Sequence, residues 1–131
     1  SHFAAVIRRL KQDFSDITIE VLIPDFQGQK SSLEVVLKAG PDILNHNVET
    51  VPRLYGEIRP EANYNQSLNI LAWSKEMVPD VMTKSGLMVG LGEEDNEVLE
   101  VIKDLLSVRC DIVTIGQYMQ PSRKHPLVRR Y

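Results

Sequence analysis

Apolar positions along the chain follow two patterns, and the chain changes repeatedly from one to the other. At the start, Phe3, Ile7, Leu10 and Phe14 lie about one helical turn apart, which predicts the apolar face of an opening helix. Four later runs are short and bounded by turn residues, which predicts strands near residues 18–23, 42–47, 81–89 and 111–116. The chain therefore begins with a helix and continues with strands separated by helical segments.

Polar residues mark where the helices between the strands begin. Ser31 and Glu34 have the spacing of a capping box, so a short helix is predicted to start there. Pro52 suits the first turn of a second helix, where its missing N–H is not needed. Asn63 and Gln66 can cap a longer helix. An acidic run leads into the last helix, where the helix dipole favours negative charge.

Strands that alternate with helices predict an α/β fold with parallel strands and right-handed crossovers. Two closures fit this order, an open doubly wound sheet or part of a β/α barrel. A complete eight-stranded barrel takes about 250 residues, and this chain has 131. We therefore expect one domain, residues 1–131, that forms part of a TIM-like barrel.

Composition and charge exclude several classes of function. The net charge is −3 and the basic residues are scattered, so we expect no nucleic-acid partner. No apolar run approaches the roughly 18 residues of a membrane span, so we expect no membrane partner. Cys110 is the single cysteine, and a lone cysteine between apolar segments is expected to be a small buried residue. We expect no metal site in this chain.

Polar residues collect where the predicted strands end, which is where parallel β/α folds place their sites. Strand alternation puts Asn45, Asn47 and Glu49 on one face, although such side chains can also satisfy loop backbone. Lys84 lies within an apolar strand and needs a carboxylate or a ligand, and Glu49 is one possible ion-pair partner. The glycines from Gly86 onward either end the strand or let the backbone approach a ligand closely.

Four stretches of the sequence resemble lipoyl synthase, an enzyme family of the radical S-adenosylmethionine (SAM) superfamily. They occur in order over essentially the whole chain, at residues 23–28, 45–54, 83–93 and 116–123. The resemblance implies a radical SAM barrel that inserts two sulfur atoms into an octanoyl chain carried on a lysine of a lipoyl-carrier protein. One 4Fe-4S cluster of that family cleaves SAM, and a second, auxiliary cluster supplies the sulfur.

The resemblance also implies roles for particular residues. Residues 86–93 resemble the superfamily element G-x-I-x-G-x-x-E, with Met88 in place of isoleucine, and this strand end lies beside the adenine in the family. The implied cofactor-binding residues are Asn45, Asn47, Glu49, Lys84, Ser85, Gly86, Gly90 and Glu93, with Lys84 and Ser85 facing one cavity. Gln117 and Arg123 are the implied supports near the substrate.

The chain departs from the family in its cluster ligands. The family binds its clusters through two cysteine trios and a late serine, and this chain has Cys110 alone. We therefore expect a later part of the barrel, truncated at both ends and inactive by itself. A biotin-synthase relative or a non-catalytic half-barrel module are the alternatives. The expected location is the bacterial cytoplasm, or a mitochondrion or plastid in a eukaryote.

Overall fold

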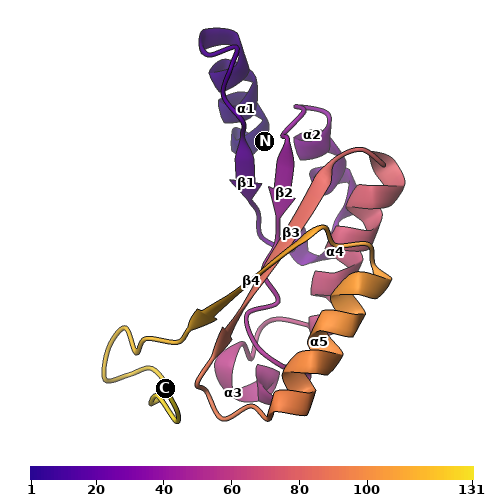
Figure 1. Cartoon of the computed structure of the whole chain (residues 1–131). Coiled ribbons are helices and arrows are strands. Elements are labelled where there is room, and N and C mark those ends of the chain that lie inside the picture. Colours follow the sequence, from indigo (N-terminus) through magenta and orange to yellow (C-terminus); the bar gives the residue numbers. More distant parts are fainter.

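The computed structural model describes residues 1–131 and contains one sheet of four parallel strands (Figure 1). The strands lie side by side in chain order: β1 (Glu20–Leu22), β2 (Ile43–Asn45), β3 (Met82–Val89) and β4 (Ile112–Gln117). The four strands and their parallel pairing were predicted correctly. The first two strands are shorter than predicted, because the chain around them leaves the sheet after three residues.

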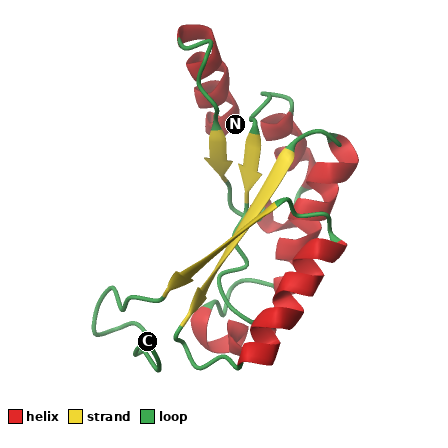
Figure 2. Cartoon of the chain, in the orientation of Figure 1, coloured by secondary structure: helices red, strands yellow, loops and turns green.

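Helices cover one face of the sheet, and the opposite face of the strands is open (Figure 2). The long helices are α1 (His2–Asp13), α2 (Lys30–Leu37), α4 (Tyr64–Met77) and α5 (Asp95–Ser107), and the short ones are η1 (Phe26–Gly28), η2 (Pro52–Leu54) and α3 (Tyr55–Ile58). Leu44 of β2 is fully buried, whereas Leu22 of β1 remains 56% exposed. The sheet therefore has one covered face and one uncovered face, as expected for an unclosed part of a barrel.

The predicted helix starts agree with the structure at three of four places, and one of them is Pro52 in the first turn of η2. The Asn63 side chain accepts a hydrogen bond from the Gln66 backbone and caps α4, and Glu94 and Glu97 form a capping box at α5. The predicted box at Ser31 is wrong. The preceding turn η1 carries the chain directly into α2, so the helix begins at Lys30 and Gln29 is its N-cap residue.

The interior consists of two apolar clusters along the covered face of the sheet. The first cluster joins α1, α2 and α4 to the amino-terminal half of the sheet, with Leu33, Leu44 and Ile70 fully buried. The second joins α4 and α5 to β3 and contains Leu71 and Leu105, also fully buried. Burial of each such side chain stabilises the fold by about 1.5–3 kcal/mol. The two clusters hold the strand ends in a fixed arrangement.

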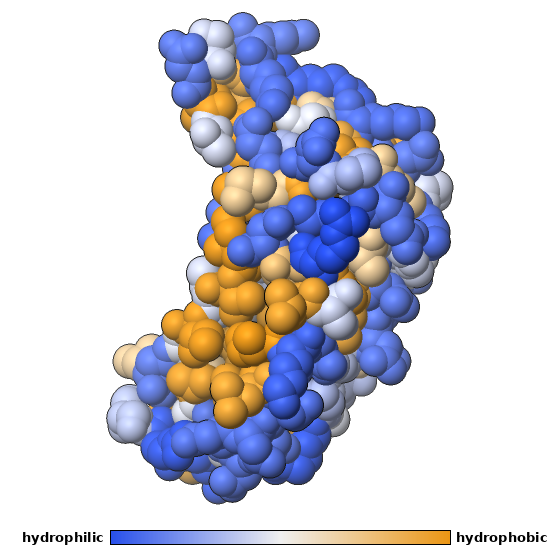
Figure 3. All heavy atoms as spheres, turned by 45° about the vertical axis from the view of Figure 1, so that its right-hand side comes forward, coloured by the Kyte–Doolittle hydropathy of each residue, from blue (hydrophilic) through white to orange (hydrophobic).

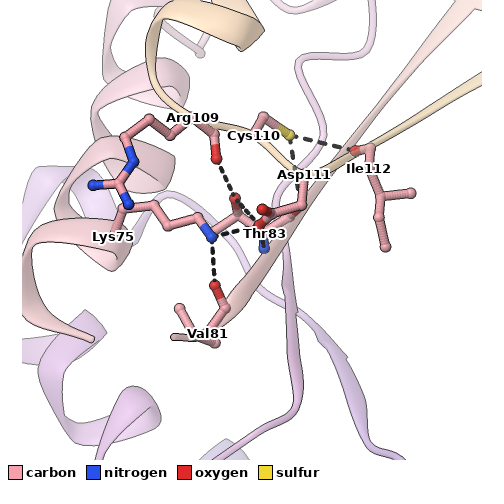
Figure 4. A network of polar contacts seen from close by, with 7 residues as sticks. All are labelled: Lys75, Val81, Thr83, Arg109, Cys110, Asp111 and Ile112. Carbon is pink, nitrogen blue, oxygen red and sulfur yellow. Dashed lines mark hydrogen bonds and ion pairs between the residues drawn. The ribbon is translucent and has the colours of Figure 1, made fainter. Parts of the chain in front are cut away.

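A polar network ties α4 to the amino ends of β3 and β4, where Lys75 reaches from α4 toward Asp111 (Figure 4). Lys75 Nζ lies 2.5 Å from the Asp111 carboxylate and donates to the Val81 carbonyl at 2.8 Å. The same carboxylate accepts from the Thr83 backbone and hydroxyl at 2.7 and 3.2 Å. We call Lys75, Thr83 and Asp111 the latch. No local sequence pattern marks the latch, because its residues lie far apart in the chain.

Large apolar side chains remain exposed on the last helix and the last strand. Leu99 and Leu106 of α5 are 60% and 72% exposed, and Ile115 of β4 is 55% exposed. Figure 3 shows an apolar area on the surface when the side of the helices is turned forward. An exposed apolar area next to an edge strand favours association with another chain or segment. No helix is both long and apolar enough to span a membrane.

Candidate functional site

A small hollow lies on the uncovered face of the sheet, at the carboxyl ends of β2 and β3. Its volume is about 230 Å³, and we call it the strand-end hollow. Its lining residues are Asn47, Glu49, Gly86, Leu87, Met88, Thr114, Ile115 and Gly116. The structure therefore brings Asn47, Glu49 and Gly86 together, at the place where parallel β/α folds position their ligands.

The backbone beyond β2 positions Asn47 and Glu49. Glu49 has a left-handed backbone conformation, with φ of 67°, and its N–H and C=O bond to the Gly86 carbonyl and the Met88 N–H at 2.9 and 2.8 Å. Only a few per cent of non-glycine residues adopt such a φ, and they concentrate at functional sites. The conformation ties the β2 loop to β3 and keeps both side chains beside the hollow.

Gly86 forms the floor of the strand-end hollow, and a side chain there would fill it. A Cβ atom at Gly86 would lie 2.8 Å from the Thr114 hydroxyl and 3.0 Å from the side-chain amide oxygen Oδ1 of Asn47. Real Cβ atoms do not approach other atoms as closely as 2.8 Å. Glycine at this position therefore lets the Asn47 and Thr114 side chains lie close together over the β3 backbone.

Asn45 and Lys84 form a second polar group, deeper along the strands. Lys84 Nζ lies 2.9 Å from the nearer Glu20 oxygen, and Asn45 Nδ2 donates to the same carboxylate at 2.8 Å. The partner of Lys84 is thus Glu20 rather than Glu49, because the parallel register puts Glu20 of β1 within reach. The hydrogen bond from Lys84 lowers the pKa of Glu20. Asn45 Oδ1 is buried and has no hydrogen-bond partner.

Ser85 does not face the same cavity as Lys84, so that expectation was wrong. Successive strand residues point to opposite faces of a sheet. Ser85 is fully buried on the helix side, where its hydroxyl accepts a hydrogen bond from the Val48 N–H at 3.2 Å. His46 is also buried and bonds to the Ile23 carbonyl and the Ser67 hydroxyl. Desolvation lowers the pKa of His46, so this histidine is a neutral structural residue.

Three further predicted residues lie together at the turn after β3. The Glu93 carboxylate accepts hydrogen bonds from the backbone N–H groups of Gly90 and Leu91 at 2.6 and 2.9 Å. Gly90 has a φ of +100°, and a Cβ there would collide with the Gln117 side chain. Gln117 donates to the Arg130 carbonyl at 3.1 Å. These residues support the turn beside the hollow and do not line it.

Arg123 stands apart from all these groups. It is exposed in the segment after β4 and makes no ion pair or hydrogen bond. The structure thus places Asn47, Glu49 and Gly86 at one hollow, Asn45 and Lys84 below it, and Arg123 away from both.

Thr114 lines the hollow and was not singled out from the sequence. It pairs with Gly86 across the sheet and lies on the uncovered face with Ile112 and Gly116. Alternation along β4 carried that signal, but the parallel register that sets Thr114 opposite Gly86 is not encoded in any local pattern.

The residues of the hollow fit a nucleoside, and those of the chain do not fit an iron–sulfur cluster. Amide, carboxylate and hydroxyl groups from Asn47, Glu49 and Thr114 can bind ribose hydroxyls, beside the apolar side chain of Met88. A cluster takes about four thiolates, whereas Cys110 is alone and half-buried at the amino end of β4. Burial raises the pKa of the Cys110 thiol, which disfavours the thiolate. No group of three or more potential metal ligands is present.

Comparison with known proteins bears out the resemblance seen in the sequence. The sequence model of the Radical SAM superfamily matches residues 1–105. A lipoyl synthase of Aquifex aeolicus is 60% identical over 132 residues, covering 100% of this chain and 48% of that protein. Lipoyl synthases of Caldanaerobacter subterraneus and Alkaliphilus metalliredigens are 54% and 55% identical, covering 100% and 99% of this chain and 46% and 45% of those proteins. The chain spans about half the length of these curated relatives and belongs to the Radical SAM superfamily.

Proposed function

We propose that the protein containing this chain is a lipoyl synthase. In this reaction two C–H bonds of a protein-bound octanoyl chain are replaced by two C–S bonds, which gives the lipoyl group. The proposal rests mainly on the identity of 54–60% to proteins named lipoyl synthase, along essentially the whole chain. The glycine-floored hollow at the strand ends is the second support, because it suits a nucleoside cofactor.

The strand-end hollow is our proposed site for part of SAM. Asn47 offers an amide donor and acceptor, Glu49 offers carboxylate oxygens, and Gly86 lets Asn47 and Thr114 lie together at the hollow. When bound and reductively cleaved, SAM supplies the hydrogen-abstracting chemistry of the superfamily. Glu93 and Gln117 act indirectly, by holding the turn at the end of β3 in place.

The remaining parts of the proposed enzyme lie outside the residues of this chain. We place both 4Fe-4S clusters on cysteines elsewhere in the protein, because Cys110 is the single cysteine here. The proposed substrate is an octanoylated lipoyl-carrier protein or domain. The cytoplasmic location expected for a bacterial protein stays a prediction.

The proposed activity can be tested with the full-length protein and an octanoylated carrier domain. The protein is reconstituted anaerobically with iron and sulfide and incubated with SAM and a reductant. Mass spectrometry of the carrier is expected to show the gain of two sulfur atoms, as the dithiol in the presence of the reductant, or with the loss of two hydrogen atoms once the disulfide of the lipoyl ring has formed. Omission of SAM is the control. Cleavage of SAM without any sulfur in the carrier would point to another radical SAM reaction and refute the proposal.

A further inference from the structure

One partly buried cation of this chain has no anionic partner. Three lysine or arginine side chains are not exposed, namely Arg59, Lys75 and Lys84. Lys75 is paired with Asp111, and Lys84 with Glu20. Arg59 forms no ion pair. Removing a positive charge from water costs free energy unless an anion lies nearby. Arg59 is therefore a candidate to bind an anionic ligand.

Contacts with the β2 loop hold the Arg59 side chain in place. Its Nη1 donates to the Tyr55 hydroxyl at 3.1 Å and lies 3.4 Å from the Asn47 carbonyl oxygen. The guanidinium also lies over the Tyr55 ring, 5.4 Å from its centroid, which is a cation–π distance. These contacts use one nitrogen of the guanidinium, and the other two make no hydrogen bond in the protein.

Arg59 lines a second hollow, at the carboxyl end of β1. The volume of this hollow is about 410 Å³, and its lining residues are Pro24, Asp25, Arg59, Pro60, Glu61 and Ala62. Asp25 lines the same hollow but makes no ion pair with Arg59, and its carboxylate accepts from the Gln27 N–H at 2.9 Å and from Gln66 Nε2 at 2.5 Å. The two free guanidinium nitrogens are therefore available to a ligand in this hollow.

We propose that Arg59 binds a carboxylate group of a ligand in this second hollow. The planar guanidinium matches a carboxylate with two parallel hydrogen bonds. Asn47 connects the two hollows, because its side chain lines the strand-end hollow and its carbonyl oxygen contacts Arg59. This inference deepens the proposed function and rests on it. Two sources can supply the carboxylate: the methionyl end of SAM, or an acidic side chain next to the octanoylated lysine of the carrier.

The test measures binding to the full-length protein by isothermal titration calorimetry. The ligands are SAM, decarboxylated SAM, and two octanoyl-lysine peptides that carry aspartate or asparagine beside the lysine. The variants are Arg59→Gln and Arg59→Lys, and the control is Arg8→Gln, which changes an exposed arginine without an ion pair. Arg59→Lys keeps the charge, so it serves as the second test if Arg59→Gln fails to fold.

We expect Arg59→Gln to weaken the binding of one carboxylate-bearing ligand by about 10- to 100-fold, the range for a hydrogen bond to a charged group. The matching ligand that lacks the carboxylate should bind Arg59→Gln and the wild type with the same affinity. A loss confined to SAM identifies the cofactor as the source, and a loss confined to the aspartate peptide identifies the carrier. Equal binding of all four ligands to both proteins would overturn the proposal. Failure of wild-type protein to bind SAM would refute the proposed function, while the peptides still test Arg59.

Discussion

The ion pair between Lys84 and Glu20 is partly exposed, and this exposure determines how much stability its removal should cost. Lys84→Met removes a cation that donates to both Glu20 oxygens, at 3.0 and 2.9 Å. The two side chains are 21% and 35% exposed, so water reaches the carboxylate that is left behind. Asn45 also continues to donate to it at 2.8 Å. We therefore expect Lys84→Met to lower the free energy of unfolding by about 1–2 kcal/mol. This value lies between the cost of breaking an exposed ion pair and the cost of breaking a fully buried one.

The same pair predicts how this loss depends on pH. The hydrogen bond from Lys84 lowers the pKa of Glu20 below its ordinary value. A carboxylate with a lowered pKa in the folded state stabilises the protein above its unfolded pKa, and this stability is lost as the pH falls through the folded pKa. The cost of Lys84→Met is thus expected to be complete at about pH 7 and smaller at about pH 3, which lies below the ordinary glutamate pKa of about 4.3.

Urea denaturation of wild-type protein and variants at both pH values measures this effect. Lys103→Met is the matched control, because Lys103 pairs with Glu100 at 2.7 Å but both side chains are more than 60% exposed. Its expected cost is below about 0.5 kcal/mol. A Lys84→Met cost equal to that of the control, or one independent of pH, would refute the reasoning. A loss of SAM affinity without loss of stability would instead make Lys84 a ligand contact.

Three further predictions concern the latch, the hollow and the cysteine. Lys75→Met leaves the Asp111 carboxylate with only its two Thr83 donors, so we expect the free energy of unfolding, measured in urea, to fall by about 2–4 kcal/mol. A cost no larger than that of Lys103→Met would contradict this prediction. Asn47→Ala in the full-length protein should weaken SAM binding by about 2- to 10-fold, as expected for one hydrogen bond, without changing the melting temperature; unchanged affinity would remove Asn47 from the site. The 131-residue chain, treated anaerobically with iron and sulfide, should show no stoichiometric 4Fe-4S absorbance, because Cys110 cannot supply the three or four thiolates that a cluster needs; a stoichiometric cluster would overturn this.

Local patterns were enough to predict the order of elements and the place of the hollow. Apolar spacing identified the strands, and their alternation with helices predicted a parallel sheet, which the structure confirms. The sequence correctly put Asn47 and Glu49 together, but for another reason than the one assumed. The strand β2 ends at Asn45, and the loop beyond it, with Glu49 in a left-handed conformation, brings both residues to the hollow. Strand alternation puts Ser85 and Lys84 of β3 on opposite faces of the sheet, contrary to the expectation that they face one cavity.

Contacts between distant segments could not be predicted from the sequence. The pairing of Lys84 with Glu20 depends on the register of three parallel strands, which no local signal sets. Thr114 lies beside Gly86 for the same reason. Arg59 follows the short helix α3, and no motif marks it. Arg59 differs from Lys75 and Lys84 because it has no ion-pair partner. Only a comparison of the partly buried charges in three dimensions reveals this difference.

The most direct test of the proposed cofactor site is the SAM affinity of the full-length Gly116→Ala variant. Gly116 lines the strand-end hollow, and a Cβ there meets no protein atom within 4 Å, so the substitution leaves the fold intact. Gly56→Ala is the control, because Gly56 of α3 has equally open space but does not line the hollow. If SAM occupies the hollow, the added methyl group should weaken its binding about 5- to 100-fold, the effect of overpacking. Gly56→Ala should bind SAM like the wild type. Unchanged affinity of Gly116→Ala would contradict the placement of SAM in this hollow.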